Sequence, residues 1–293
     1  MPLISMRPML KQARAGRYGI AAFNMIDYNS ARAIVEGAAE LEAPIIVQAS
    51  VKTVKHWGYK PVASWVRLLA ESVDVPVGLH LDHCTDLEVI KRCIDAGWTS
   101  VMFDGSALPF ADNLAKSLQV YALTEQAGIG LEAEMGAIGG VEDDKIVKEG
   151  MAALANYDEC VAFCKELPHL AVFAPAIGTA HGFYKGEPKI AYDLLESVAK
   201  KTGMPIALHG GTGLSQEQFD RCIAGGCAKV NISTMHKHCF IEGFISVQRE
   251  NPKQSEPLPF IAHQYEAMKR DVKDMVRAFG SAGKATHAHA AAE

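Results

Sequence analysis

The sequence lacks the features of a secreted, membrane-spanning or nucleic-acid-binding protein. Its first 20 residues contain no long apolar segment, so we expect no secretory signal. No run of ~18 uncharged apolar residues is present that could cross a membrane. The seven cysteines are scattered and form no Cys-x-x-Cys pair, which favours reduced thiols in a cytoplasmic protein over a disulfide framework. An excess of positive charge is also missing, and with a formal net charge of −5 nucleic acid is not an expected partner.

The 293 residues have an ordinary globular balance, with 49% apolar and 22% charged side chains. Short apolar segments alternate with longer amphipathic ones, and we predict that the short ones are β-strands. Eight strands are predicted, at residues 18–24, 43–50, 76–83, 99–105, 130–136, 169–178, 205–211 and 228–234. Helices are predicted between them, for example at residues 29–42, 86–97 and 215–226.

Several of these strands are apolar on both faces, which is typical of a parallel sheet covered by helices. Eight strand-then-helix units predict a closed (β/α)8 barrel, the TIM barrel; an open doubly wound sheet fits the count of eight less well. We expect this barrel and a C-terminal helical extension over residues 1–284, with a disordered tail at 285–293. Residues 136–150 are predicted to form a mobile loop, and residues 251–260 to interrupt the last helical segment.

Polar residues stand at the ends of the predicted strands. In this fold the carboxyl ends of the strands and the loops that follow form the active face. The candidates are Asn24, Ser50, Asp82, His83, Asp104, Glu134, His181, His209, Asn231 and Thr234. Three of them are histidines from different strand ends, and a catalytic zinc ion favours three protein ligands with imidazole nitrogens. The pattern predicts a shared metal ion, against the alternative that each histidine is only a hydrogen-bonded residue of the cleft.

Glycines and hydroxyls lie close to the sixth, seventh and eighth strands. They are Gly182, the run "GGTG" at 210–213 and the run "NIST" at 231–234. Barrel enzymes often bind phosphate near their last two strands through backbone N–H groups, and glycine permits the close approach. The pattern indicates a ligand that carries phosphate, although "HGGTG" by itself also fits a simple tight turn.

Six segments resemble the class II, metal-dependent ketose-bisphosphate aldolases. They are "HLDH", "SVMFDGSALPFADN", "EAEMGAIGGVEDD", "IGTAHGFYKGEPK", "ALHGGTG" and "KVNIST". The nearest branch is the one that contains tagatose-bisphosphate and fructose-bisphosphate aldolases. The resemblance runs from about residue 5 to residue 284, nearly the whole chain.

The resemblance implies a cytoplasmic barrel enzyme that reversibly cleaves a ketose 1-phosphate or 1,6-bisphosphate into dihydroxyacetone phosphate and an aldehyde, through a zinc-stabilised enediolate. One zinc ion per subunit would be bound by His83, His181 and His209. Asp82 would be the acid/base at the C4 hydroxyl, unless it only orients a histidine. Glu142 matches the acid that moves a proton at C3, unless it is only a solvated carboxylate of the loop.

Further expectations come from the same resemblance. Asp104 and Glu134 match positions that can hold a second or displaced metal ion. A monovalent cation, Na⁺ or K⁺, is expected near the phosphate, and the partners are a small phosphosugar substrate and further copies of the chain in a homodimer or homotetramer. The expected substrate-binding residues are Asn24, Ser50, Gly182, Lys185, Gly210, Gly211, Thr212, Asn231, Ser233 and Thr234.

The sequence departs from the family pattern at two positions. Relatives usually carry an arginine, aligned with Leu258, that grips the distal phosphate of a bisphosphate; an isobutyl group cannot make that bidentate contact. Either another cation replaces it, from Lys185 or a neighbouring subunit, or the substrate is a ketose 1-phosphate with an uncharged or carboxylated distal end. Ser233 stands where relatives often have Asp or Ala.

Two other classes of function remain as alternatives. A zinc hydrolase on the same barrel would need no phosphate loops, and a non-catalytic sugar-phosphate binding protein would be expected to have lost Asp82 or a histidine ligand. Both fit less well, because the phosphate loops, Asp82 and all three histidines are present.

Overall fold

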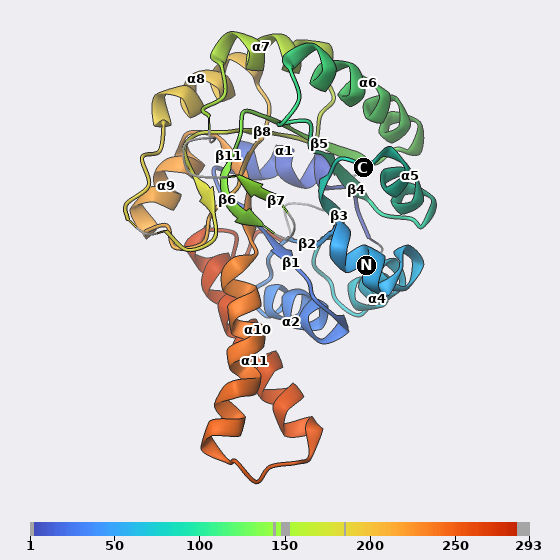
Figure 1. Ribbon diagram of the computed structural model, residues 1–293, viewed down its shortest axis with the longest axis vertical. Helices are drawn as coiled ribbons and strands as arrows, with labels where there is room; N and C mark the ends of the chain where they lie inside the picture. Colours follow the sequence, from blue (N-terminus) through green and yellow to red (C-terminus); the bar gives the residue numbers. More distant parts are fainter. Residues whose placement is uncertain (1–2, 143–144, 148–152, 185, 286–293) are drawn as a thin grey trace.

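A closed barrel of eight parallel strands forms the centre of the protein, which we describe from a computed structural model over residues 3–142, 145–147, 153–184 and 186–285 (Figure 1). Strand β1 pairs with both β2 and β11, so the sheet has no free edge. The predicted (β/α)8 barrel is therefore confirmed. In order around the barrel the strands are β1 (Ile20–Asn24), β2 (Ile45–Ser50), β3 (Val77–Cys84), β4 (Ser100–Phe103), β5 (Gly130–Met135), β8 (Val172–Pro175), β10 (Ile206–Leu208) and β11 (Cys227–Ile232).

Helices surround the barrel because their apolar faces pack on the outward-facing side chains of the strands. Short polar residues start several of them: Asp27 and Ser215 each form a capping box, and Asp86 accepts hydrogen bonds from two N–H groups of the first turn. The covering helices are α2 (Tyr28–Ala39), α3 (Val51–Trp57), α4 (Tyr59–Glu71), α5 (Leu87–Asp95), α6 (Phe110–Ala127), α7 (Tyr157–Glu166), α8 (Tyr192–Thr202) and α9 (Gln216–Ala224).

Helix α1 (Met6–Gly16), which the sequence pattern did not reveal, closes the amino-terminal end of the barrel. Met6, Met9 and Leu10 are buried there against small inward-facing side chains such as Ala22 and Ala207. Because this end is filled with apolar groups, a ligand can reach the barrel interior only from the carboxyl ends of the strands.

Helices α10 (Thr234–Glu250) and α11 (Pro257–Ala278) form a hairpin that extends away from the barrel (Figure 1). The predicted interruption at 251–260 is confirmed for residues 251–256, which form the turn between them, whereas residues 257–260 belong to the first turn of α11. Asn29 of α2 anchors α11 by donating to the carbonyl of Ile261 at 3.1 Å. The hairpin exposes large apolar side chains, with Ile241 54% and Leu258 68% exposed.

The segment predicted as a mobile loop, 136–150, is partly regular structure. It contains β6 (Gly139–Glu142) and β7 (Lys145–Val147), which pair with each other, and β6 also pairs with β9 (Ala180–His181). The glycine-rich composition that suggested a loop instead allows close pairing, since a Cβ at Gly140 would lie 2.1 Å from the carbonyl oxygen of His181. Ala285, the first residue of the predicted tail, is buried and donates to the carbonyl of Glu42, while residues 286–293 lie outside the described part.

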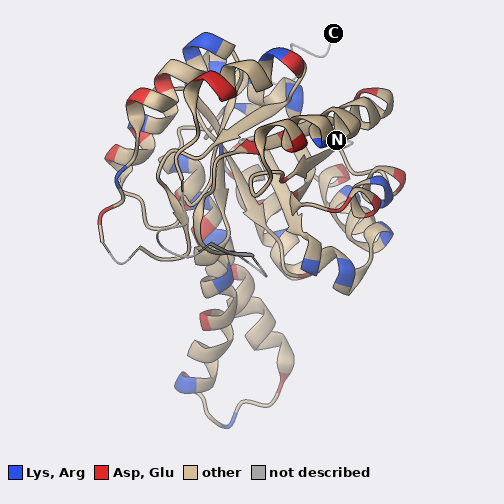
Figure 2. Cartoon of the chain, turned by 45° about the horizontal axis from the view of Figure 1, so that its top comes forward, with Lys and Arg blue, Asp and Glu red and all other residues tan. Residues whose placement is uncertain are grey.

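Charged side chains of both signs are interspersed over the outer helices (Figure 2), whereas Glu132 and Lys229 are enclosed in the barrel without exposed surface. All seven cysteines are free, and six are buried, as their scattered spacing predicts. Within the described residues, no helix combines the length and apolar character needed to span a membrane.

Candidate active site and metal centre

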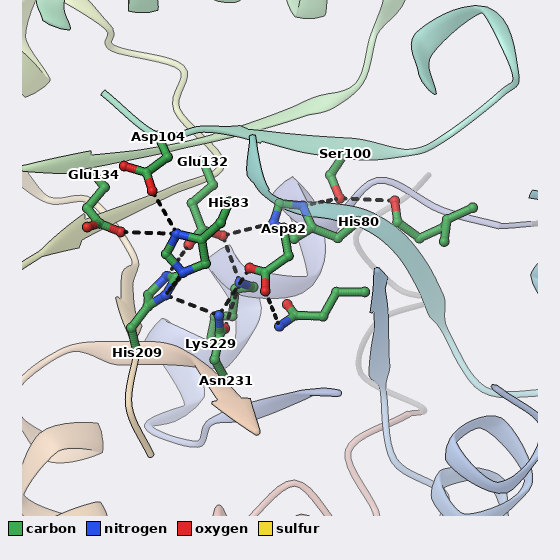
Figure 3. A network of polar contacts seen from close by, with 12 residues as sticks. His80, Asp82, His83, Ser100, Asp104, Glu132, Glu134, His209, Lys229 and Asn231 are labelled. Carbon is green, nitrogen blue, oxygen red and sulfur yellow. Dashed lines mark hydrogen bonds and ion pairs between the residues drawn. The ribbon is translucent and has the colours of Figure 1, made fainter. Parts of the chain in front are cut away.

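Polar side chains from several strands meet inside the carboxyl half of the barrel and point toward one another (Figure 3). Alternate residues of a strand share a face, so β3, β5 and β11 each contribute two polar residues, spaced two apart, to the interior. The lower layer contains His80, Ser100, Glu132 and Lys229, and the layer at the mouth contains Asn24, Gln48, Asp82, Glu134 and Asn231. Histidines and carboxylates of the adjoining loops complete the mouth.

Asp82 and His83 both face this interior although neighbours in a strand normally point to opposite faces. Strand β3 contains one extra residue here, because its residues 81 and 84 pair with residues 101 and 103 of β4. His83 takes a left-handed conformation with φ of 45°. Such a conformation costs a non-glycine residue about 1–3 kcal/mol and is typical of functional sites. The bulge thus brings a carboxylate and an imidazole to one cavity from adjacent positions.

The structure brings His83, His181 and His209 together from β3, β9 and the end of β10. One nitrogen donor from each ring lies within 4.8 Å of the other two. Nε2 of His83 lies 2.9 Å from Nδ1 of His209.

Carboxylates on the far sides of two rings indicate which nitrogen carries the proton. Nδ1 of His83 lies 2.9 Å from Asp104, and Nε2 of His209 lies 2.7 Å from Glu132. Each carboxylate accepts, so each of these nitrogens donates. The two facing nitrogens then present lone pairs 2.9 Å apart, which repel each other unless a cation lies between them. Carboxylate–histidine pairs of this kind commonly orient metal ligands, so the residues present fit a metal ion.

The ring of His209 is also in the protonation state that binds metal. Burial lowers its pKa to about 4, because a charged imidazolium would have to lose its hydration inside the barrel. At neutral pH the ring is therefore uncharged and offers one nitrogen lone pair to an ion.

A second group of potential ligands adjoins the first. His83, Asp104 and Glu134 also place one donor atom each within 4.8 Å, with Glu134 3.8 Å from Nδ1 of the ring. The two residues expected at a second metal position therefore lie together. A metal on Nδ1 of His83 would displace the proton that this nitrogen donates to Asp104, so the two arrangements use the ring differently.

The carboxylate of Asp82 is buried beside the histidines, and three neutral side-chain amides hold it. It accepts from Asn24 at 2.9 Å, Gln48 at 3.2 Å and Asn231 at 3.3 Å. The amide of Asn231 also lies 3.3 Å from Nδ1 of His209, which links the carboxylate to the histidine cluster. Asp82 is outside both groups of candidate metal ligands. It is thus placed to exchange a proton next to a bound ion.

The glycine-rich turn after β10 meets the start of α10. Gly210 has φ of +67°, and a Cβ there would lie 2.4 Å from the carbonyl oxygen of Ala180, so only glycine fits. Thr212 accepts from the backbone N–H of Met235 at 3.5 Å. Ser233 precedes α10, and its buried hydroxyl has no hydrogen-bond partner among the described residues. A helix N-terminus with an available hydroxyl is suited to bind an anion.

The other predicted site residues occupy different surroundings. Ser50 caps α3, and Gly182 follows His181 with φ of +96° and open space around its α-carbon. Glu142 ends β6, and its side chain lies outside the described part, as does the whole of Lys185. Leu258 lies on the hairpin, away from the barrel interior.

Five residues of the interior were missed by sequence reasoning: Gln48, His80, Ser100, Glu132 and Lys229. A signal was present, because "HLD", "EAE" and "KVN" each place polar residues two apart in an apolar strand. In a barrel this spacing directs both members of each pair inward.

Comparisons with known proteins agree with this geometry. The family model described as fructose-bisphosphate aldolase class-II matches residues 4–284. The chain is 38% identical to a fructose-bisphosphate aldolase of Geobacillus stearothermophilus, over 97% of this chain and 99% of the relative. It is 36% identical to a sulfofructosephosphate aldolase of Alkalicoccus urumqiensis, with the same coverage.

The fold is also similar to a solved structure, the YdjI aldolase of Escherichia coli K12. The TM-score is 0.85 at 26% identity, and the match covers 97% of this chain and 99% of that one. The family match and the two curated relatives span nearly the whole chain. The protein is therefore an aldolase that belongs to the class II fructose-bisphosphate aldolase family.

Proposed function

We propose that this protein is a zinc-dependent aldolase that reversibly cleaves a ketose 1-phosphate or 1,6-bisphosphate, of the fructose or tagatose type, into dihydroxyacetone phosphate and an aldehyde. One observation carries the proposal: donors of His83, His181 and His209 lie within 4.8 Å of one another, and Asn231 connects His209 to the carboxylate of Asp82. Three imidazole donors favour zinc over magnesium or calcium, which prefer oxygen ligands.

Cleavage between C3 and C4 requires the C4 hydroxyl to lose its proton while the electrons of the bond move onto C3. We assign the C4 proton to Asp82, whose carboxylate is fixed by three amides and is not a candidate metal ligand. A positioned base contributes ~10²–10⁴ in rate. When bound, zinc would supply a Lewis acid for the charge that develops beside the substrate carbonyl. Glu142 is proposed to transfer the proton at C3.

The phosphate on C1 is proposed to bind between the turn at 210–212 and the start of α10, with Gly182 nearby. The contact of Thr212 with Met235, which joins these two segments, supports this position. So does the buried hydroxyl of Ser233, which lacks a hydrogen-bond partner within the part of the chain described here. A monovalent cation, Na⁺ or K⁺, near this phosphate stays a prediction from the family resemblance.

Aldol cleavage through a lysine imine is the chemical alternative. Among the described residues, Lys229 is the one buried lysine. Its ammonium group lies 2.8 Å from Glu132 and donates to Asn231 at 2.7 Å, so it is held as a cation rather than as a nucleophilic amine. We expect borohydride to trap no covalent adduct with substrate.

The distal end of the substrate separates two candidate functions. The family resemblance predicts an arginine where this chain has Leu258, and the side chain of Leu258 is 68% exposed on the hairpin. This observation favours a ketose 1-phosphate without a distal phosphate. The relatives themselves are named for different substrates, one for fructose bisphosphate and the other for sulfofructose phosphate.

We also propose that the chain forms a homodimer or homotetramer through the α10–α11 hairpin. This hairpin extends from the barrel and exposes Ile241, Phe244, Leu258 and Ile261 to between 37% and 68%. Exposed apolar side chains gathered on one projection are typical of protein–protein contacts.

Chelation tests the metal-dependent part of the proposal. EDTA should abolish cleavage and added zinc should restore it, whereas full activity in metal-free protein would end the assignment. A panel of aldehydes condensed with dihydroxyacetone phosphate, with the product configuration determined, tests the substrate. If a ketose 1-phosphate is turned over as fast as its 1,6-bisphosphate, or faster, the candidate without a distal phosphate is correct.

A further inference from the structure

Lys229 is enclosed in the barrel on β11, directly below the candidate active site (Figure 3). Its side chain has no exposed surface. Lysine is almost never fully buried unless it is paired, and a pair of buried charges is often no more stabilising than apolar residues of the same size. Stability alone therefore does not explain a buried charge at this position, and the contacts of the ammonium group indicate another role.

One contact leads to the metal centre. The Nζ atom of Lys229 lies 2.8 Å from Oε2 of Glu132, and the other oxygen of that carboxylate lies 2.7 Å from Nε2 of His209. This second oxygen requires a proton on Nε2, which leaves Nδ1 to face the other histidines. The ammonium group thus neutralises the carboxylate that sets the orientation of a candidate metal ligand.

The other contact leads to the acid/base. The Nζ atom donates to Oδ1 of Asn231 at 2.7 Å. An amide whose oxygen faces a cation must turn its NH₂ group the opposite way. That NH₂ group lies 3.3 Å from Asp82 and 3.3 Å from Nδ1 of His209. Without the cation, only the two longer contacts of the NH₂ group, at 3.3 Å each, would hold the amide in this orientation.

We propose that Lys229 is a positioning residue that couples the metal centre to the acid/base. Through Glu132 it fixes the orientation of His209, and through the amide oxygen of Asn231 it directs the NH₂ group of that residue toward Asp82. The inference rests on the proposed function and adds residues to it. An apolar residue of equal size could fill the volume of Lys229, but it could not hold either neighbour in its orientation. The charge is therefore retained for the geometry of the site rather than for stability.

The test compares Lys229→Met, Glu132→Gln and the double variant, which restores neutrality. Zinc affinity of the metal-free proteins is measured by competition with a chelator, and kcat and KM are measured at saturating zinc. Each single variant leaves one buried charge unpaired and should melt at a lower temperature than the wild type. The double variant should recover thermal stability, yet keep zinc affinity ~10–100-fold below wild type. Its kcat should stay at least about tenfold low, with a smaller change in KM.

The double variant distinguishes a positioning role from a purely structural one even if a single variant fails to fold. Recovery of zinc affinity and kcat together with stability would show a purely structural pair and overturn the proposal. Val230→Ala is the matched control: this buried neighbour on the same strand belongs to the outer core, so its loss should lower stability alone. A wild type that binds no zinc would instead overturn the proposed function, so the two failures are distinguishable.

Discussion

Replacing Asp82 with alanine removes the proposed base while leaving all three candidate zinc ligands in place. A positioned base contributes ~10²–10⁴ in rate, and each factor of ten corresponds to about 1.4 kcal/mol of activation free energy. We therefore expect Asp82→Ala to lower kcat by about 10²–10⁴, a loss of roughly 3–6 kcal/mol of transition-state stabilisation. Zinc affinity should change little, since Asp82 is not a candidate ligand.

The fold should tolerate this change. Three amides lose an acceptor, but Gln48 keeps its bond to Asn24 at 2.7 Å, and Nδ2 of Asn231 keeps its contact with Nδ1 of His209 at 3.3 Å. The Nδ2 group of Asn24 is then the main unpaired donor, at a cost of about 1–3 kcal/mol. That is less than the 5–15 kcal/mol that typically stabilises a protein of this kind. The variant should remain folded, so its rate reports on the chemistry.

Release of dihydroxyacetone phosphate and bound zinc should be measured on the same preparation. Asp86→Ala is the control, because it removes a carboxylate that caps α5, at a cost of about 0.5–2 kcal/mol, outside the site. It should keep a wild-type kcat. If Asp82→Ala cleaves substrate within a few-fold of wild type while zinc remains bound, the assignment of the base is wrong.

Three further predictions concern the glycine turn, the buried interior and the hairpin. Gly210 and Gly128 share a φ of +67°, but a Cβ would lie 2.4 Å from the carbonyl of Ala180 at the first and have nothing within 4 Å at the second. Gly210→Ala should therefore lower the melting temperature more than Gly128→Ala, and equal losses would contradict the packing argument. Burial, reinforced by the ammonium group of Lys229, lowers the pKa of His80 below 6.5. As the pH falls below 6.5, the ring of His80 therefore takes up a proton in the unfolded chain but not in the folded one. Urea unfolding of the metal-free protein should show the free energy of unfolding falling from about pH 6.5 downwards, and falling less steeply in His80→Gln. The same dependence on pH in both proteins would refute this prediction. Ile241→Asp should shift the oligomer toward monomer in light scattering, and a variant that keeps the wild-type mass would exclude this surface.

The barrel could be predicted because its information is local. Eight apolar segments alternate with amphipathic ones. In a closed parallel barrel the carboxyl ends of all strands lie at the same end, so residues that finish the strands come together there. This is why His83, His181 and His209, distant in the sequence, could be expected in one cavity.

The remaining features depend on contacts that no local pattern specifies. The bulge at His83 arises from the register between β3 and β4, and the pairing of β6 with β9 joins segments that read as loops. The spacing of Lys229 and Asn231 directs both side chains inward, but the ion pair of Lys229 with Glu132 joins strands that lie far apart in the sequence and could not be predicted from it. The exposed position of Leu258 follows from the length and direction of the hairpin, which its sequence does not reveal.

The most direct test of the account is a crystal structure of the zinc-loaded protein with anomalous scattering recorded at the zinc edge. We predict one strong peak about 2.0–2.1 Å from Nε2 of His83, Nδ1 of His209 and a ring nitrogen of His181. A peak bound only by Asp104 and Glu134, or no peak among the three rings, would contradict the central claim.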